Sequence, residues 1–373
     1  MKDVYLDYSA TTPCNSEVLD TYIKVVNKYY ANPNSLHKLG VEAKELILSA
    51  TKQVANLLAV KESEIIFTSG ATESNNLAIY GLINKYPNRG KHILTTHLEH
   101  SSINESLKYL EKRGYIIDYL KLDKFGKVDI NDLKSKLNND VILVTIAHVN
   151  SETGIVQDVN EIGKIIKDYK QTTFHVDGTQ AIGKIKVKLD NIDMYTISSH
   201  KIYGIKGVGI LVKKENIDID PIIHGGKSQT IFRSGTPASG LIVAMSKALR
   251  LALFDIDNKY NHVKELSDYL KENLKNINNL VINSNQNSIP HIVNISVFGI
   301  KSETLQHSLE LKNIYVSTKT ACSKDSQKSE ALEALGFDDN ISKHSIRISI
   351  SYLTTKEEID YLIESLKDII NNI

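Results

Sequence analysis

The stretch that decides the fold runs from residue 173 to 214 and reads TFHVDGTQAIGKIKVKLDNIDMYTISSHKIYGIKGVGILVKK. It holds three β-rich runs, TFHVDG, MYTISS and VGILVKK. Asp177 ends the first run, and Lys201 follows the second. A lysine after a strand is usually only a solvated charge. In a parallel sheet, however, the carboxyl ends of the strands meet at one edge, where ligands bind. The stretch therefore predicts a strand-edge site as well as a sheet.

The alternation of strands and helices extends toward the N-terminus. Helical patterns cover residues 104–114 and 160–170, between further β-rich runs at 64–69, 92–96, 115–122 and 141–149. Short strands that alternate with amphipathic helices are typical of a sheet covered by helices on its faces. The sequence therefore predicts an α/β fold with a mostly parallel sheet of seven strands.

The C-terminal third follows a different order. A long helical pattern at about 237–276 precedes β-rich runs at 280–284, 291–297, 314–318 and 345–351, with helical patterns at 302–312 and 355–372. This order predicts a smaller α+β domain, and 373 residues suffice for one large and one small domain. We assign residues 15–256 to the large domain and residues 1–14 and 257–373 to the small one.

Composition excludes several classes of protein. The 45 basic and 44 acidic residues leave a net charge of +1, which gives no field to attract nucleic acid or an acidic membrane. No apolar run is long enough to span a membrane, and MKDVYLDYSATTP lacks a signal-peptide core, so we expect a cytoplasmic protein. Cys14 and Cys322 have no metal-ligand spacing, so we expect neither a disulfide framework nor a metal site.

The segment IIFTSGATESNN, residues 65–76, is a candidate anion site. A strand ends at Ser69 and a helix begins at once, so Gly70 and Ala71 let the backbone approach an anion. Free N–H groups at the start of the helix and the Thr72 hydroxyl supply donors. The alternative is an ordinary helix cap by Thr72.

Two further side chains follow strands at the same edge. Asp177 is costly at the end of an apolar strand unless it pairs with a cation or a protonated nitrogen; the alternative is a capping or ion-paired aspartate. His100 can stack on a planar ligand or move protons; the alternative is a structural histidine. A phosphate, a ring cation and an aldehyde together define pyridoxal phosphate. Lys201 would then bond to the aldehyde, and Asp177 would hold the ring nitrogen protonated.

Ten blocks between about residues 5 and 360 resemble, in order, the pyridoxal-phosphate cysteine desulfurases, most closely the branch that serves iron–sulfur and nitrogenase cluster assembly. They are YLDYSATTP, NPNSLHKLG, FTSGATESNN, EHSS, HVNSETG, HVDGTQAIGK, SSHKIYGIKGVG, RSGT, TACS and SIRISIS. The resemblance implies a fold type I homodimer that converts L-cysteine to L-alanine. It also implies that the sulfur leaves as a persulfide on Cys322 for an acceptor protein, such as an iron–sulfur scaffold or a tRNA-thiolation enzyme.

The resemblance also implies roles for the cofactor site. Lys201 would bond to the aldehyde and move the Cα proton, with His100 over the ring and Gln180 donating to the phenolic oxygen. Asp177 would pair with the ring nitrogen. The implied phosphate contacts are Gly70, Ala71, Thr72, Ser198 and His200, with Thr236 reaching in from the other subunit.

On the substrate side, the resemblance implies that Arg347 pairs with the carboxylate, near Asn34, Asn150 and Ser151. Cys322 matches the catalytic cysteine, and its polar, small neighbours in STKTACSKDSQKSE are typical of a surface loop. Cys14 matches no functional position, and we interpret it as structural.

Some positions depart from the family. Ser151 stands where a second asparagine is usual, and other departures are Lys227, Ser228, Gln229, Lys319, Ser351 and Tyr352. Two alternatives therefore stay open: another fold type I enzyme, such as an aminotransferase or a selenocysteine lyase, and a non-catalytic scaffold that kept the fold.

Overall fold

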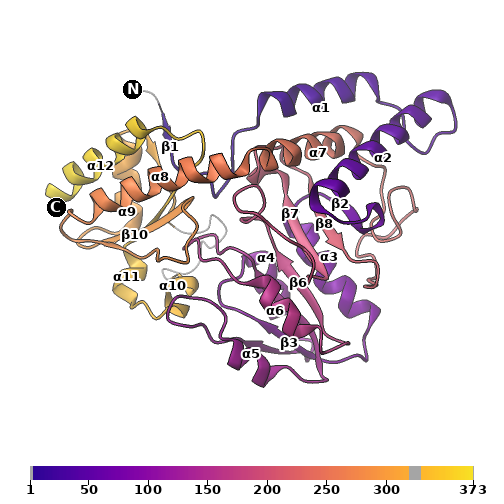
Figure 1. The fold of residues 1–373 in the computed structure, drawn as a ribbon, viewed down its shortest axis with the longest axis horizontal. Helices are drawn as coiled ribbons and strands as arrows, with labels where there is room; N and C mark the ends of the chain where they lie inside the picture. Colours follow the sequence, from indigo (N-terminus) through magenta and orange to yellow (C-terminus); the bar gives the residue numbers. More distant parts are fainter. Residues whose placement is uncertain (1–2, 319–328, 373) are drawn as a thin grey trace.

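The computed structural model describes residues 3–318 and 329–372 and contains a large sheet of seven strands (Figure 1). Their order across the sheet is β2-β8-β7-β6-β5-β3-β4, and all neighbours are parallel except the two pairs that involve β8. The strands are β2 (Ile65–Thr68), β3 (His92–Thr95), β4 (Ile116–Tyr119), β5 (Val141–Ala147), β6 (Thr173–Asp177), β7 (Met194–Ser198) and β8 (Gly209–Lys213). The predicted fold class is confirmed.

Helices cover both faces of this sheet. Ile66 and Ile93 point to the face that packs on α3 (Ala71–Lys85) and α4 (Ser101–Glu111). Ile65 and Phe67 point to the opposite face. That face packs on α2 (Lys38–Leu58), α5 (Ile130–Lys136), α6 (Val159–Ile166) and α7 (Ser239–Leu253). Since β5 reads VILVTIA and is buried throughout, it forms the two-sided centre expected of a parallel sheet.

Two helices lie outside those layers. The helix α1 (Ser16–Lys28) packs on α7, and α8 (Ile256–Leu274) leads from α7 to the C-terminal region (Figure 1). The long helical pattern predicted for 237–276 is therefore two helices. Asp255, between them, has φ = 54°, a left-handed conformation that ends the first helix.

The C-terminal region has its own hydrophobic core, which includes residues from α8 and the N-terminal strand β1 (Val4–Tyr5). Strand β1 pairs in parallel with β11 (Ile314–Tyr315). The other elements are β9 (Leu280–Ile282), β10 (Ile292–Val297), β12 (Ser345–Ser349), α9 (Ser302–Glu310), α10 (Glu330–Ala334), α11 (Asp339–Lys343) and α12 (Lys356–Asn371). Single-turn helices occur at Glu62–Glu64 (η1) and Ser199–Lys201 (η2).

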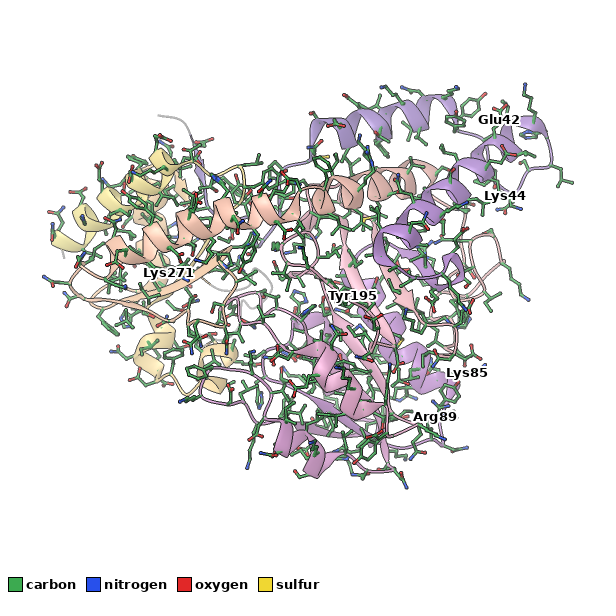
Figure 2. All side chains as sticks on the ribbon, in the orientation of Figure 1. Glu42, Lys44, Lys85, Arg89, Tyr195 and Lys271 are labelled. Carbon is green, nitrogen blue, oxygen red and sulfur yellow. The ribbon has the colours of Figure 1, made fainter. Side chains whose placement is uncertain are left out.

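Charged and apolar side chains separate as the fold requires. Glu42, Lys44, Lys85 and Arg89 lie at the periphery, whereas Tyr195 lies inside the large sheet (Figure 2). Within the described ranges, every helix is too short or too polar to cross a membrane.

Candidate active site

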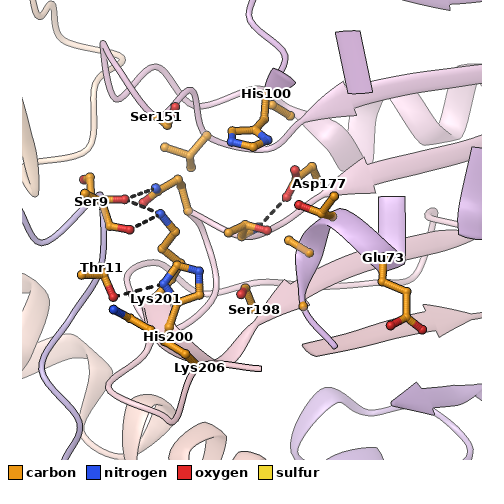
Figure 3. A pocket seen from close by; sticks show the side chains of 18 of the residues that line it. Ser9, Thr11, Glu73, His100, Ser151, Asp177, Ser198, His200, Lys201 and Lys206 are labelled. Atoms are coloured by element: carbon orange, nitrogen blue, oxygen red, sulfur yellow. Dashed lines mark hydrogen bonds between the residues drawn. The ribbon is translucent and has the colours of Figure 1, made fainter. Parts of the chain in front are cut away.

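A cavity of about 590 Å³ opens at the carboxyl ends of the parallel strands (Figure 3). It brings together most of the predicted site residues from distant parts of the chain. Those that line it are Gly70, Ala71, Thr72, His100, Ser151, Asp177, Gln180, Ser198, His200, Lys201 and Arg347. The N-terminal segment, with Ser9, Ala10 and Thr11, forms part of the wall.

Lys201 stands at the end of η2, directly after β7. Its Nζ donates to the backbone carbonyls of Ser9, at 2.6 Å, and Ala10, at 2.7 Å. The segment that carries these carbonyls is fixed in turn, because Thr12 donates its backbone N–H to the His200 carbonyl over 2.9 Å. The amine is therefore held in the cavity, in a defined position next to the N-terminal segment.

Asp177 is 6 % exposed at the end of β6. Its Oδ2 accepts from Asn75 Nδ2 and its Oδ1 from the Thr179 N–H, both over 2.9 Å. The next residue must be small: a Cβ on Gly178 would lie only 1.9 Å from the Tyr195 ring. Tyr195 thus packs directly beneath the turn and keeps the carboxylate at the cavity wall.

His100 caps α4, and its Nδ1 accepts from the Ser102 N–H at 3.1 Å. Burial is the main cause that lowers the pKa of the imidazole, and the Lys201 charge lowers it further, while Asp177 opposes both. A neutral ring whose Nδ1 accepts carries its proton on Nε2. Asn75 Nδ2 also donates to Ser102 Oγ over 2.9 Å. The Asn75 amide therefore forms hydrogen bonds both to Ser102, which contacts His100, and to Asp177.

The start of α3 forms another part of the wall. Gly70 precedes the helix and makes no side-chain cap, so the first turn keeps its donors for a ligand. This backbone passes close to β8, because a Cβ on Gly209 would lie 2.7 Å from the Gly70 Cα. The Ser198 and Thr179 hydroxyls are buried and lack a hydrogen-bond partner among residues 3–318 and 329–372. Unpartnered hydroxyls beside free helix N–H groups fit a phosphate.

His200 and Lys206 add further donors to this end of the cavity. Burial, followed by the charges of neighbouring lysines, lowers the pKa of His200 to about 4. His200 is therefore neutral at pH 7, with its Nδ1 3.2 Å from Thr11 Oγ1. The positive charge at this end comes instead from Lys206, which the sequence analysis did not single out.

Arg347 projects from β12 and is 2 % exposed. Its Nη2 lies 2.7 Å from Asp7 Oδ1, and its Nη1 donates to the Ser151 carbonyl over 2.9 Å. Its Nε is buried without a partner in the part of the chain that the structure describes. The guanidinium also lines the cavity, where its fixed plane of N–H groups suits a carboxylate.

Glu99, next to His100, is a buried acid that the sequence analysis missed. Its Oε1 accepts from the Ala147 N–H at 2.9 Å and from Thr96 Oγ1 at 2.8 Å. Burial raises the pKa of this carboxyl to about 8, and the Asp177 charge adds to the shift. Glu99 therefore carries a proton at pH 7.

Three predicted site residues within the described ranges, Asn34, Asn150 and Thr236, do not line the cavity. Asn150 is buried and points to the backbone: it donates to the Leu98 carbonyl and accepts from Glu152 and Thr153. Asn34 is exposed between α1 and α2, and Thr236 is exposed between β8 and α7. Cys322 lies outside the described residues. Cys14, interpreted above as structural, is exposed.

The comparisons with known proteins agree with this geometry. Residues 4–362 match the family model described as aminotransferase class-V. A cysteine desulfurase IscS of Dictyoglomus turgidum is 38 % identical over 377 residues, which cover 100 % of this chain and 95 % of the relative. Among solved structures, a NifS-like protein has a TM-score of 0.94 and 34 % identity, with 100 % of both chains covered. SspA in complex with cysteine has a TM-score of 0.83 and 29 % identity, covering 95 % of this chain and 100 % of that one. The chain belongs to the class-V aminotransferases and, within them, to the cysteine desulfurases.

Proposed function

We propose that this protein is a cysteine desulfurase that takes L-cysteine to L-alanine and transfers the sulfur to Cys322. The observation that carries the proposal is the meeting of Lys201, Asp177 and Arg347 around one cavity. An amine, a carboxylate and a guanidinium at one site match an aldehyde, a ring nitrogen and an amino-acid carboxylate. Membership of the family supports the same reaction.

The residues present fit pyridoxal phosphate. The Ser198 hydroxyl, which has no hydrogen-bond partner among the described residues, and the uncapped start of α3 would hold the phosphate, while Asp177 would accept from the ring nitrogen. When bound, the group supplies an electron sink for the bond pair released at the substrate Cα. The family is pyridoxal-phosphate-dependent, and we propose that this chain holds the cofactor through the residues named above.

The protein's own side chains then have separate tasks. Arg347 orients the substrate carboxylate, and Lys201 moves the proton at Cα. The Cys322 thiolate attacks the substrate sulfur, so an S–S bond forms as the C–S bond breaks. The electron pair of the C–S bond stays with carbon, which takes a proton and becomes the methyl group of L-alanine. The sulfur remains on Cys322 as a persulfide.

The test compares Cys322→Ala with Cys14→Ala, supplying each purified protein with L-cysteine and a reductant and measuring alanine and sulfide. We expect Cys322→Ala to bind the cofactor normally but to lose at least about 100-fold in product formation, because it lacks the nucleophile. Cys14→Ala, which changes the exposed cysteine, should match the unmodified protein. Equal turnover in Cys322→Ala would refute the persulfide mechanism and favour another pyridoxal-phosphate enzyme. Cofactor uptake without turnover in any of the proteins would favour a non-catalytic scaffold.

We also propose a homodimer, supported by exposed apolar side chains on and between α1 and α2. Leu36 is 97 % exposed and Tyr30 is 74 % exposed. Large apolar side chains that lie exposed near one another are unusual on the surface of a monomer. The other exposed apolar residues of this segment are Leu19, Ile23, Val26, Leu39, Val41 and Leu48. A partner at this surface would cover them, and its Thr236 would complete the phosphate site.

Leu36→Asp tests the dimer, with Leu311→Asp as the matched control because Leu311 is 88 % exposed in the C-terminal region. We expect Leu36→Asp to sediment as a monomer at concentrations where the control stays dimeric, since a charge in the interface is strongly disfavoured. Sedimentation velocity measures the difference. If both variants keep the mass of the unmodified protein, this surface is not the interface.

The remaining expectations belong to the same proposal. We propose that the persulfide supplies an iron–sulfur scaffold or a tRNA-thiolation enzyme, that the protein works in the cytoplasm and that it contacts no nucleic acid directly. The division into a large domain at 15–256 and a small one at 1–14 and 257–373 likewise stays a proposal, supported by the separate cores.

A further inference from the structure

Lys184 is a buried lysine without a role in the reaction described so far. It is 8 % exposed and forms no ion pair within residues 3–318 and 329–372. Its Nζ donates to Gln180 Oε1, four residues earlier in the sequence. It also lines a second, small cavity of about 20 Å³ behind the candidate active site, together with Lys201 and His291.

The contact with Lys184 determines which end of the Gln180 amide faces which partner. With its oxygen bound to the ammonium, the amide must present its NH₂ group elsewhere, and Nε2 donates to the Ser9 carbonyl over 2.9 Å. That same carbonyl accepts from Lys201. Without such a contact, the amide group of a glutamine can rotate by about 180°, which exchanges the positions of its NH₂ donor and its oxygen acceptor. In its charged form, the Lys184 amine accepts no hydrogen bond, so it permits only one orientation of the amide.

The charges around Lys184 do not stabilise its ammonium. Burial, followed by the positive charges of Lys201 and Arg347, lowers its pKa to about 7. Two histidines on which its charge acts, His200 and His291, are neutral at pH 7 because burial lowers the pKa of each. An ammonium in such surroundings destabilises the folded protein. A contribution to stability therefore does not explain its presence.

We propose that Lys184 is a positioning residue that locks Gln180 as a hydrogen-bond donor toward the cofactor's phenolic oxygen and places a positive charge behind Lys201. The inference rests on the proposed function, since it concerns how this chain receives pyridoxal phosphate. A donor and a nearby cation both favour the anionic form of that oxygen. Without Lys184, the amide is free to turn its own oxygen toward the anion.

The test uses Lys184→Met, which keeps an unbranched side chain and removes the amine, and Lys188→Met as the matched control at an exposed lysine of the same segment. Pyridoxal phosphate is added back to cofactor-free protein, and its dissociation constant is measured. The pH at which the bound group changes colour is measured by absorbance. We expect Lys184→Met to weaken binding about tenfold, the effect of one charged hydrogen bond. We also expect the colour change to move to higher pH, because the lost cation had favoured the deprotonated form. Lys188→Met should change neither quantity.

A double-mutant cycle separates positioning from general damage. If Lys184 acts through Gln180, the loss in cofactor affinity from Lys184→Met should largely disappear in a Gln180→Leu background. Urea unfolding of the cofactor-free protein provides the second readout. The folded-state pKa of Lys184 lies below its ordinary value of 10.5. Above pH 10.5 the amine is neutral in both the folded and the unfolded protein, so it does not affect stability. As the pH falls from 10.5 to about 7, the unfolded chain binds the proton first, and the folded protein loses stability. The free energy of unfolding of Lys184→Met should therefore exceed that of the unmodified protein by more at pH 7 than at pH 10.

Two results would overturn the inference while leaving the proposed function intact. One is a Lys184→Met protein with unchanged affinity and unchanged colour midpoint. The other is a loss of affinity that persists in full beside Gln180→Leu or follows a fall in urea stability. If the unmodified protein takes up no pyridoxal phosphate, the proposed function fails, and this inference fails with it.

Discussion

Lys201→Ala is expected to abolish the covalent attachment of pyridoxal phosphate and to reduce alanine formation by about 10³-fold or more. The lysine supplies both the bond to the aldehyde and the base at Cα, and removal of a general base alone costs about 10² to 10⁴ in rate. The measurement is borohydride reduction followed by mass spectrometry, which locates the pyridoxyl group on the peptide that contains residue 201.

Lys206→Ala is the matched control for that experiment, because Lys206 also lines the cavity but follows η2 by five residues. This variant should keep the pyridoxyl group on Lys201, with weaker cofactor binding at most. A pyridoxyl group attached to Lys206 in the unmodified protein, with Lys201 unlabelled, would contradict the assignment of the reactive amine.

Arg347→Met is expected to raise the KM for L-cysteine about 100-fold and to leave the cofactor absorbance in place. The guanidinium offers donors in a fixed plane that suit a carboxylate, and two hydrogen bonds to a charged group are together worth roughly 3 kcal/mol or more. The variant should also unfold at lower urea concentration, because Asp7 loses the partner that lies 2.7 Å away. Steady-state kinetics and urea titrations measure the two effects.

Asp7→Asn separates those effects. It keeps the guanidinium and retains an oxygen that accepts from Nη2, so the KM should change by less than about threefold. A KM that rises equally in Asp7→Asn and Arg347→Met would show that the ion pair, and not a contact with substrate, accounts for the loss.

Much of the fold follows from local patterns. The strands from β2 to β8 coincide with β-rich runs because turns and amphipathic helices separate them clearly. Lys201 and Asp177 also follow from strand position, since the carboxyl ends of parallel strands share an edge. The break between α7 and α8 does not follow, because the apolar periodicity continues past Asp255, whereas its left-handed backbone depends on the surrounding packing.

The parts of the site that the sequence did not predict depend on distant or indirect partners. Asp7 and Arg347 stand 340 positions apart, so no local pattern connects them. Asn75 acts between Asp177 and Ser102, two groups that only the folded chain brings together. Asn150 was assigned to the substrate beside Ser151, yet adjacent residues in a turn face different ways, and only Ser151 lines the cavity.

The N-terminal segment has a consequence for how the chain is handled in the laboratory. Val4 and Tyr5 pair with β11, and Ser9 and Ala10 hold the Lys201 amine only a few residues later. Trimming the chain by a dozen residues would thus remove a β-strand partner and both lysine acceptors at once. A purification tag is better placed after α12, because neither the β1–β11 pairing nor the two contacts of the Lys201 amine involve that end of the chain.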